Sequence, residues 1–175
     1  MVEKDTIIKE KIKYTGLGEF KPIYKFARDW FWKEDFAVVE DSYTEKVMGS
    51  AKEIEMEWTA NKKITDYFRI TIKLKWRILN MTDVEVEVEG KRKKMHNFGE
   101  LGIEMKGILE KDYSSKWGAS AYERFFKEVY QKYVVPQRTE RKEDQTRDFV
   151  QDFKEEMKAF LELSGRGYNP KINFS

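Results

Sequence analysis

The chain has 175 residues, and its 34 lysines and arginines nearly balance 32 aspartates and glutamates, for a formal net charge of +2. This balance argues against a dedicated nucleic-acid-binding protein, whose domains carry a clear basic excess. The absence of cysteine excludes disulfides, zinc–thiolate sites and cysteine nucleophiles. We expect a single α+β domain over residues 1–165, followed by a tail over residues 166–175.

The N-terminal segment predicts one strand and one helix. Over residues 8–14 Ile8, Ile12 and Tyr14 alternate with Lys9, Lys11 and Lys13, a pattern typical of a half-buried strand. Gly16 and Gly18 end that pattern. Over residues 19–34 apolar side chains recur at helical spacing, and Pro22 falls where an early helical turn tolerates it. We therefore expect a strand followed directly by a helix.

The middle of the chain predicts strands, because apolar and polar residues alternate from about residue 36 to residue 113. The expected strands cover residues 36–48, 53–60, 68–78, 84–89 and 101–109. The polar positions are acidic over 53–59, basic over 68–78 and acidic again over 84–89. Opposite charges on facing strands are stabilising. The pattern therefore places 68–78 between 53–59 and 84–89.

Two helices are expected at the C-terminal end. Ser120 and Glu123 form a capping-box pattern that starts a helix running to about Val135, before Pro136. A longer helix is expected from about Thr139 to Leu163. The predicted fold is a curved antiparallel sheet of about six strands with one N-terminal and two C-terminal helices, an order similar to helix-grip folds.

Three short segments carry a resemblance to other proteins. The opening KIKYTG…FKPIY, the strand EIEMEW and the segment FFKEVYQKYVV resemble a group of small uncharacterised archaeal proteins. The likeness covers most of the chain. It implies a lineage and no activity.

The tryptophans suggest one candidate site. Trp58 and Trp76 fall on the apolar faces of strands expected to be neighbours, so they should point the same way. With Trp30 and Trp117 they are candidates to line a cavity for an apolar ligand between sheet and helix. The alternative, which we favour, is that they fill the core.

The long C-terminal helix carries a second candidate, a series of acids at every fourth position. Like charges at this spacing destabilise an isolated helix. The half of the helix before Phe149 also has no aliphatic or aromatic residue, so we do not expect it to pack in the core. It either projects into solvent or docks a partner. The docking candidates are Glu140, Asp144, Asp148, Asp152 and Glu156.

A basic run next to the only histidine is the third candidate. Lys91, Arg92, Lys93, Lys94 and His96 could contact phosphates or an acidic partner. The favoured alternative is a charged hairpin beside the Glu-rich strand, with a solvated loop histidine.

No catalytic motif, metal-ligand spacing or cofactor loop is present in the sequence. We therefore predict a non-enzymatic structural or interaction protein that self-associates or docks through its C-terminal helix. A carrier of an apolar ligand is the alternative, and a nucleic-acid or ribosome-associated protein is a weaker one. The charged N-terminus and the lack of long apolar runs predict a cytoplasmic protein with no membrane span.

Overall fold

A computed structural model describes residues 2–113, 120–133 and 135–166. Within them the fold is α+β, with a five-stranded antiparallel sheet and three helices. In chain order the elements are β1 (Glu3–Gly18), α1 (Phe20–Lys33), β2 (Ala37–Met48), β3 (Ala51–Lys63), β4 (Phe68–Val88), β5 (Lys91–Lys111), α2 (Ala121–Tyr133) and α3 (Val135–Arg166).

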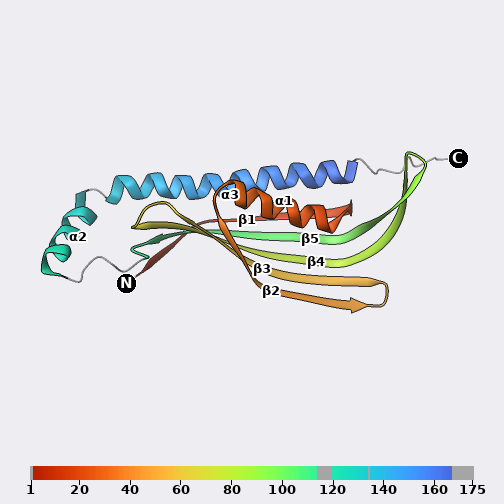
Figure 1. Cartoon of the computed structure of the whole chain (residues 1–175), viewed down its shortest axis with the longest axis horizontal. Helices are drawn as coiled ribbons and strands as arrows, with labels where there is room; N and C mark the ends of the chain where they lie inside the picture. Colours follow the sequence, from red (N-terminus) through yellow and green to blue (C-terminus); the bar gives the residue numbers. More distant parts are fainter. Residues whose placement is uncertain (1, 114–119, 134, 167–175) are drawn as a thin grey trace.

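The strands are long and lie in the order β1-β5-β4-β3-β2, so that the first strand pairs with the last. The molecule is elongated, with α2 at one end and the tips of the β2–β3 and β4–β5 hairpins toward the other (Figure 1). Tight turns explain both hairpins. Gly49 has a φ of 62°, and Glu89 and Gly90 have φ values of 51° and 76°, as hairpin turns that follow the twist of the strands require.

The prediction of about six strands is wrong by one. Residues 68–78 and 84–88 belong to one continuous strand, β4, and the Glu-rich part of it pairs with the basic start of β5 instead of with 68–78. Asn80 takes a left-handed conformation with a φ of 53°, which asparagine tolerates better than most residues. The irregularity bends β4 without ending it. The predicted pairing of 53–59 with 68–78 is confirmed.

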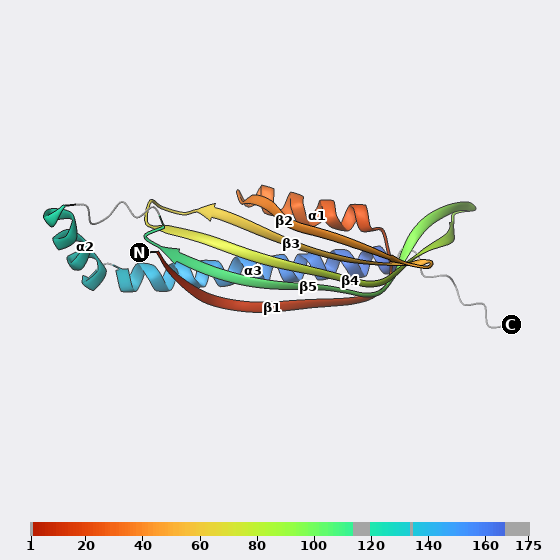
Figure 2. The same ribbon diagram turned by 90° about the horizontal axis from the view of Figure 1, so that it is seen from below.

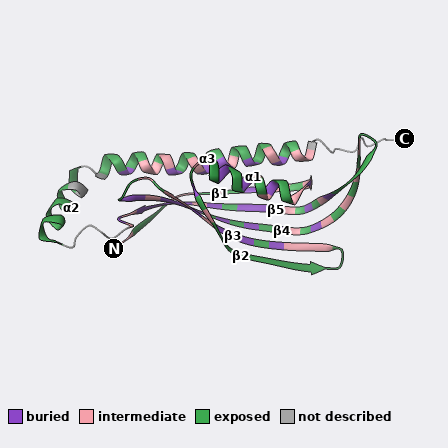
Figure 3. Ribbon diagram, in the orientation of Figure 1, coloured by how far each residue is buried: buried purple, intermediate pink, exposed green. Residues whose placement is uncertain are grey.

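Helices α1 and α3 pack against one face of the sheet, here called the inner face, and no described helix covers the opposite, outer face (Figure 2). Buried side chains follow the inner positions of β3, β4 and β5 and the sheet-facing side of α3 (Figure 3). The core they form is largely aliphatic and aromatic, and its helical members are Ile23, Ala27, Trp30, Phe31, Val150, Phe153, Met157 and Leu161. The predicted range of the N-terminal helix, 19–34, agrees with α1 to within one residue at each end.

The first half of α3 packs on the sheet, which corrects the expectation that it would not. Thr146 is fully buried and Thr139 nearly so. The close approach depends on Gly107 in β5, where a β-carbon would lie 3.1 Å from the methyl of Thr146 and 3.0 Å from Val150. Small side chains therefore replace the apolar stripe that helical packing ordinarily uses.

Helix α2 begins with the predicted capping box. The backbone N–H of Ser120 donates to Glu123 at 3.1 Å, and the backbone N–H of Glu123 donates to the Ser120 hydroxyl at 3.2 Å. The helix leaves the body of the molecule and exposes several large apolar side chains, namely Tyr122, Phe125, Phe126, Val129 and Tyr133 (Figure 3). In the described part of the chain, no helix combines the length and apolar character needed to cross a bilayer.

Candidate functional site: a lysine row on the open sheet face

Every second residue of each strand points to the outer face of the sheet, and because most of these residues are polar, the face is polar. Two neighbouring rows of side chains across the strands are paired by charge. Arg77 of β4 lies 3.5 Å from Glu55 of β3. In the next row Lys75 contacts Glu57 at 3.6 Å and Lys11 contacts Glu104 at 3.3 Å. These alternating charges are the cross-strand pairs that stabilise an exposed sheet face.

The following row breaks this pattern. Lys9 of β1 pairs in register with Lys106 of β5, and Lys106 pairs with Lys73 of β4. We call these three residues the lysine row. Neighbouring strands lie about 4.8 Å apart, so three ammonium groups are held side by side. Like charges directly opposite one another destabilise a sheet, and the row therefore costs the fold stability.

Within the described residues, no member of the lysine row forms an ion pair or hydrogen bond. Lys9 and Lys73 are exposed and Lys106 is half-buried. At the β3 end of the row stands Thr59, whose hydroxyl donates to Asp41 at 2.5 Å. The three ammonium groups are thus available to a ligand, since nothing described neutralises them.

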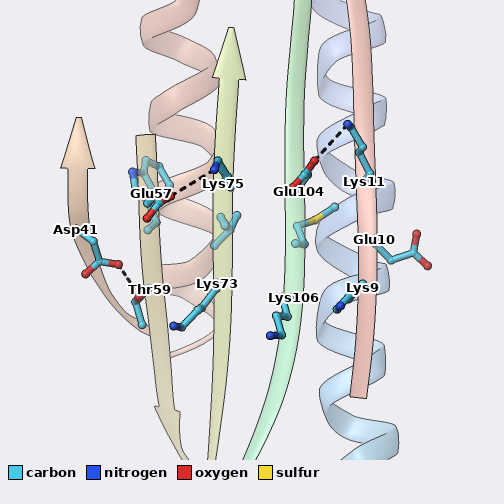
Figure 4. A pocket seen from close by; sticks show the side chains of 13 residues that line it. Lys9, Glu10, Lys11, Asp41, Glu57, Thr59, Lys73, Lys75, Glu104 and Lys106 are labelled. Atoms are coloured by element: carbon cyan, nitrogen blue, oxygen red, sulfur yellow. Dashed lines mark hydrogen bonds and ion pairs between the residues drawn. The ribbon is translucent and has the colours of Figure 1, made fainter. Parts of the chain in front are cut away.

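The lysine row lies in a hollow of about 700 Å³ on the outer face. Figure 4 shows the side chains around it, with Lys9, Lys73 and Lys106 at neighbouring positions on three strands. The acids that line the hollow are already engaged. Glu57 and Glu104 contact lysines of the adjacent row, whereas Asp41 accepts from the neutral Thr59 hydroxyl and keeps its charge, one negative charge against the three of the lysine row. The uncompensated charge of the hollow is therefore positive.

Glu10 also borders the hollow but its side chain points away from the lysines (Figure 4). It accepts hydrogen bonds from Lys154 at 2.6 Å and from Gln151 at 2.9 Å, both on α3. The bond from the Lys154 ammonium holds the pKa of Glu10 below its ordinary value, against the opposing effect of desolvation. Glu10 thus ties β1 to α3 and does not neutralise the lysine row.

The chemistry of the hollow is electrostatic binding. Lysine ammonium groups offer donors and charge to carboxylates or phosphates. The described residues contain no group of three His, Asp or Glu side chains placed to hold a metal ion. The arrangement is suited to an anionic partner.

The tryptophans proposed for a ligand cavity lie in the core. Trp58 and Trp76 are almost fully buried, with ring centroids 5.2 Å apart. Trp30 packs edge-on against Phe153 of α3. Trp117 lies outside the described residues. This packing is what the core-filling alternative predicts, and the cavity stays a prediction. One detail favours the cavity: the indole N–H of Trp76 is buried and has no hydrogen-bond partner among the described groups.

The basic run forms the start of β5 and is a strand, not a loop. Its side chains face the Glu-rich end of β4, with Glu85 opposite Lys94 and Glu87 opposite Arg92. Lys93 also forms an ion pair with Glu19. The favoured alternative predicts that this basic run and the acidic strand partly neutralise each other, and the register agrees with it. The other member of the run is Lys91, opposite Val88 at the turn.

His96 is half-buried in β5, so the expectation of a solvated loop histidine is wrong. Its Nδ1 accepts a hydrogen bond from the backbone N–H of Phe20, at the start of α1, at 3.3 Å. Its Nε2 lies 3.4 Å from Asp83. The ring thus satisfies a free amide at the helix N-terminus.

The acids proposed for docking are all exposed on α3. Glu140, Asp144, Asp148, Asp152 and Glu156 form what we call the acidic stripe. The structure places this stripe on the side of the molecule opposite the lysine row, because α3 covers the inner face (Figure 2).

Sequence reasoning missed the lysine row, although the sequence carries a signal for one of its two pairings, that of Lys73 with Lys106. The turn at Glu89 and Gly90 sets Val88 opposite Lys91, and the same register continues to Phe68 opposite Lys111. Lys73 therefore had to face Lys106 once β4 was recognised as one strand. The position of Lys9 depends on the pairing of β1 with β5, for which no local signal exists.

Comparison with known proteins adds no lead to these observations: the chain matches no family model, no curated protein and no solved structure.

Proposed function

We propose that this chain is a non-catalytic interaction protein that docks an acidic segment of a protein partner on the lysine row. The observation that carries the proposal is the row itself. Lys9, Lys106 and Lys73 stand side by side without a carboxylate partner among the described residues, next to a row that is paired by charge. A sheet that keeps repelling lysines at this position gains stability when carboxylates bind there.

The surroundings favour a protein partner over a nucleic acid. The hollow is lined by lysines, acids and a threonine on its open side, with no exposed aromatic ring on which a base could stack. Lys75 and Lys11 of the adjacent row are already paired with Glu57 and Glu104, so they offer little charge to a phosphate backbone that continued past the lysine row. The net charge of +2 also gives little long-range attraction for nucleic acid.

The fold supports a binding role for the outer face. We infer a helix-grip-like arrangement, in which the long antiparallel sheet holds α3 against its inner face and β1 joins the last strand. This arrangement leaves the outer face as a broad rigid surface, and sites built on strands are held more precisely than sites on loops.

A labelled acidic peptide tests the proposal. Fluorescence anisotropy at low salt should show that a fluorescein-labelled peptide containing six glutamates binds the protein, and that binding weakens as salt rises. The variant Lys9→Glu, Lys73→Glu, Lys106→Glu should bind at least about tenfold more weakly, a loss of about 1.4 kcal/mol.

The matched control is Lys21→Glu, Lys25→Glu, Lys33→Glu, which makes the same change of net charge at three exposed lysines of α1. It should retain most of the binding. Equal losses of peptide binding in the two variants would show that binding depends only on net charge, and would refute the proposal. Tighter, row-dependent binding of a single-stranded DNA oligonucleotide than of the peptide would replace it with the nucleic-acid alternative.

A further inference from the structure

The acidic stripe of α3 lies on the molecule's helical side, and four of its five acids have no partner among the described residues. Asp144 contacts Arg147 at 2.9 Å. For Glu140, Asp148, Asp152 and Glu156 the described residues provide no ion pair or hydrogen bond. The molecule thus carries unpaired acids on one side and three unpaired lysines on the other.

The two sets match in spacing. Residues four apart on a helix rise about 6 Å along its axis and turn about 40° around it, so three successive acids stay on one side of the helix. The lysines of the row lie on neighbouring strands about 4.8 Å apart. The difference of about 1 Å for each step is within the reach of the flexible lysine stem. An α3 helix laid across β1, β5 and β4 would therefore bring three successive acids, such as Asp144, Asp148 and Asp152, to the three lysines.

One molecule cannot make this contact with itself. The lysine row faces outward from the sheet, while α3 is packed on the inner face (Figure 2). A second copy can make it, because both surfaces are open in the described part of the chain. The contact joins two different surfaces, so each copy keeps one free row and one free stripe. Such heterologous contacts generate closed rings or open filaments and do not stop at a dimer.

We propose that the occupant of the lysine row is the acidic stripe of a second copy of this chain. The inference rests on the proposed function and names its partner. The protein then assembles into rings or open stacks, held by charge and dissolved by salt. Three charge pairs at a partly open surface give a weak contact, so assembly needs high protein concentration and low ionic strength.

Charge exchange between two variants tests the contact. In the first variant Asp144, Asp148 and Asp152 become Lys, and in the second Lys9, Lys73 and Lys106 become Glu. Wild type at about 20 mM salt should give species larger than a dimer in sedimentation velocity, and should return to monomer at roughly 0.5 M salt. Each variant alone should stay monomeric, because its two surfaces carry the same sign of charge.

An equimolar mixture of the two variants should recover the large species. The lysine-bearing α3 of the first variant then meets the glutamate row of the second, and the unchanged surfaces also match. Circular dichroism checks that both variants are folded. A second pair of variants removes the charges without reversing them. One member carries Lys→Gln at the three positions of the lysine row, and the other carries Asp→Asn at Asp144, Asp148 and Asp152. Each member of this pair should also be monomeric, and their mixture should stop at a one-to-one dimer, because only the lysine row of one member and the acidic stripe of the other still match.

Three results would overturn the inference. Wild type could be monomeric at every salt concentration, the folded mixture could fail to recover the large species, or the row variant could assemble like wild type. The labelled hexaglutamate peptide is measured on the same samples. Row-dependent peptide binding without assembly would leave the proposed function standing and reject only this partner, whereas loss of both rejects both.

Discussion

At the scale of single residues, the contact between α3 and the sheet depends on Gly107. A β-carbon at this position would lie 2.9 Å from Ile8, 3.0 Å from Val150 and 3.1 Å from Thr146. Each distance is shorter than carbon atoms in contact ordinarily keep. The glycine therefore sets how closely the helix approaches β5 and β1.

Replacing Gly107 by Ala should lower the free energy of unfolding by about 1–3 kcal/mol, the usual cost of overpacking. Gly102, on the same strand, is the matched control, because a β-carbon there would have its nearest neighbour at 3.6 Å. Gly102→Ala should be neutral or slightly stabilising, since alanine loses less backbone entropy on folding. Urea denaturation measures both. Equal effects would show that helix approach does not depend on Gly107.

At the scale of elements, α3 is fastened to the edge strand β1 through Glu10. Lys154 and Gln151 both donate to its carboxylate, and the pKa of Glu10 lies below its ordinary value of 4.5 as a result. A carboxylate with a lowered pKa in the folded state stabilises the fold above about pH 4.5. That contribution is lost as the pH falls through the lowered pKa.

The variant Glu10→Gln should therefore be less stable than wild type at pH 7, and the difference should shrink as the pH falls below about 4.5. Urea denaturation at a series of pH values measures the difference. Glu155→Gln is the control, because Glu155 is exposed on α3, the helix that carries Lys154 and Gln151, and has no described partner. A difference between Glu10→Gln and wild type that stays constant with pH would contradict the role of the charged tether.

The elements that local patterns determine were predictable from the sequence. The capping box at Ser120 and the helical spacing in α1 gave the starts of α2 and α1. The period of two located part of every strand, but β1 and β5 extend well beyond the predicted ranges 8–14 and 101–109. Asn80 was not recognised, because a left-handed residue inside a strand leaves no clear trace in the alternation. The packing of Thr146 was missed because a buried threonine facing a glycine is not an apolar stripe.

The candidate site was less predictable than the fold. The sequence drew attention to tryptophans and to a basic run, since both stand out by residue type. Lys9, Lys73 and Lys106 do not stand out, because each is one polar residue in an alternating strand. Their meaning comes only from the pairing of strands far apart in the chain, which local periodicity does not fix.

At the scale of the whole molecule, the outer face has two kinds of lysine that look alike in the sequence. Lys75 faces Glu57 on β3 and Glu104 on β5. Lys73, two residues earlier, faces Thr59 and Lys106. The charge pattern of the strands alone predicts that an acid at either position destabilises the sheet. The register of the strands instead predicts opposite effects at the two positions.

We expect Lys75→Glu to lower the free energy of unfolding and Lys73→Glu to raise it, each by about 0.2–1 kcal/mol for each cross-strand pair changed. Lys75→Glu would place three acids in one row, whereas Lys73→Glu would relieve the repulsion by Lys106. Urea denaturation at low and high salt measures both, and the two effects should shrink as salt screens the charges. A similar loss of stability in both variants would refute the repulsion within the lysine row. If Lys73→Glu stabilises the monomer and also weakens binding of the acidic peptide, the lysine row costs stability because it binds, a trade-off common at functional sites.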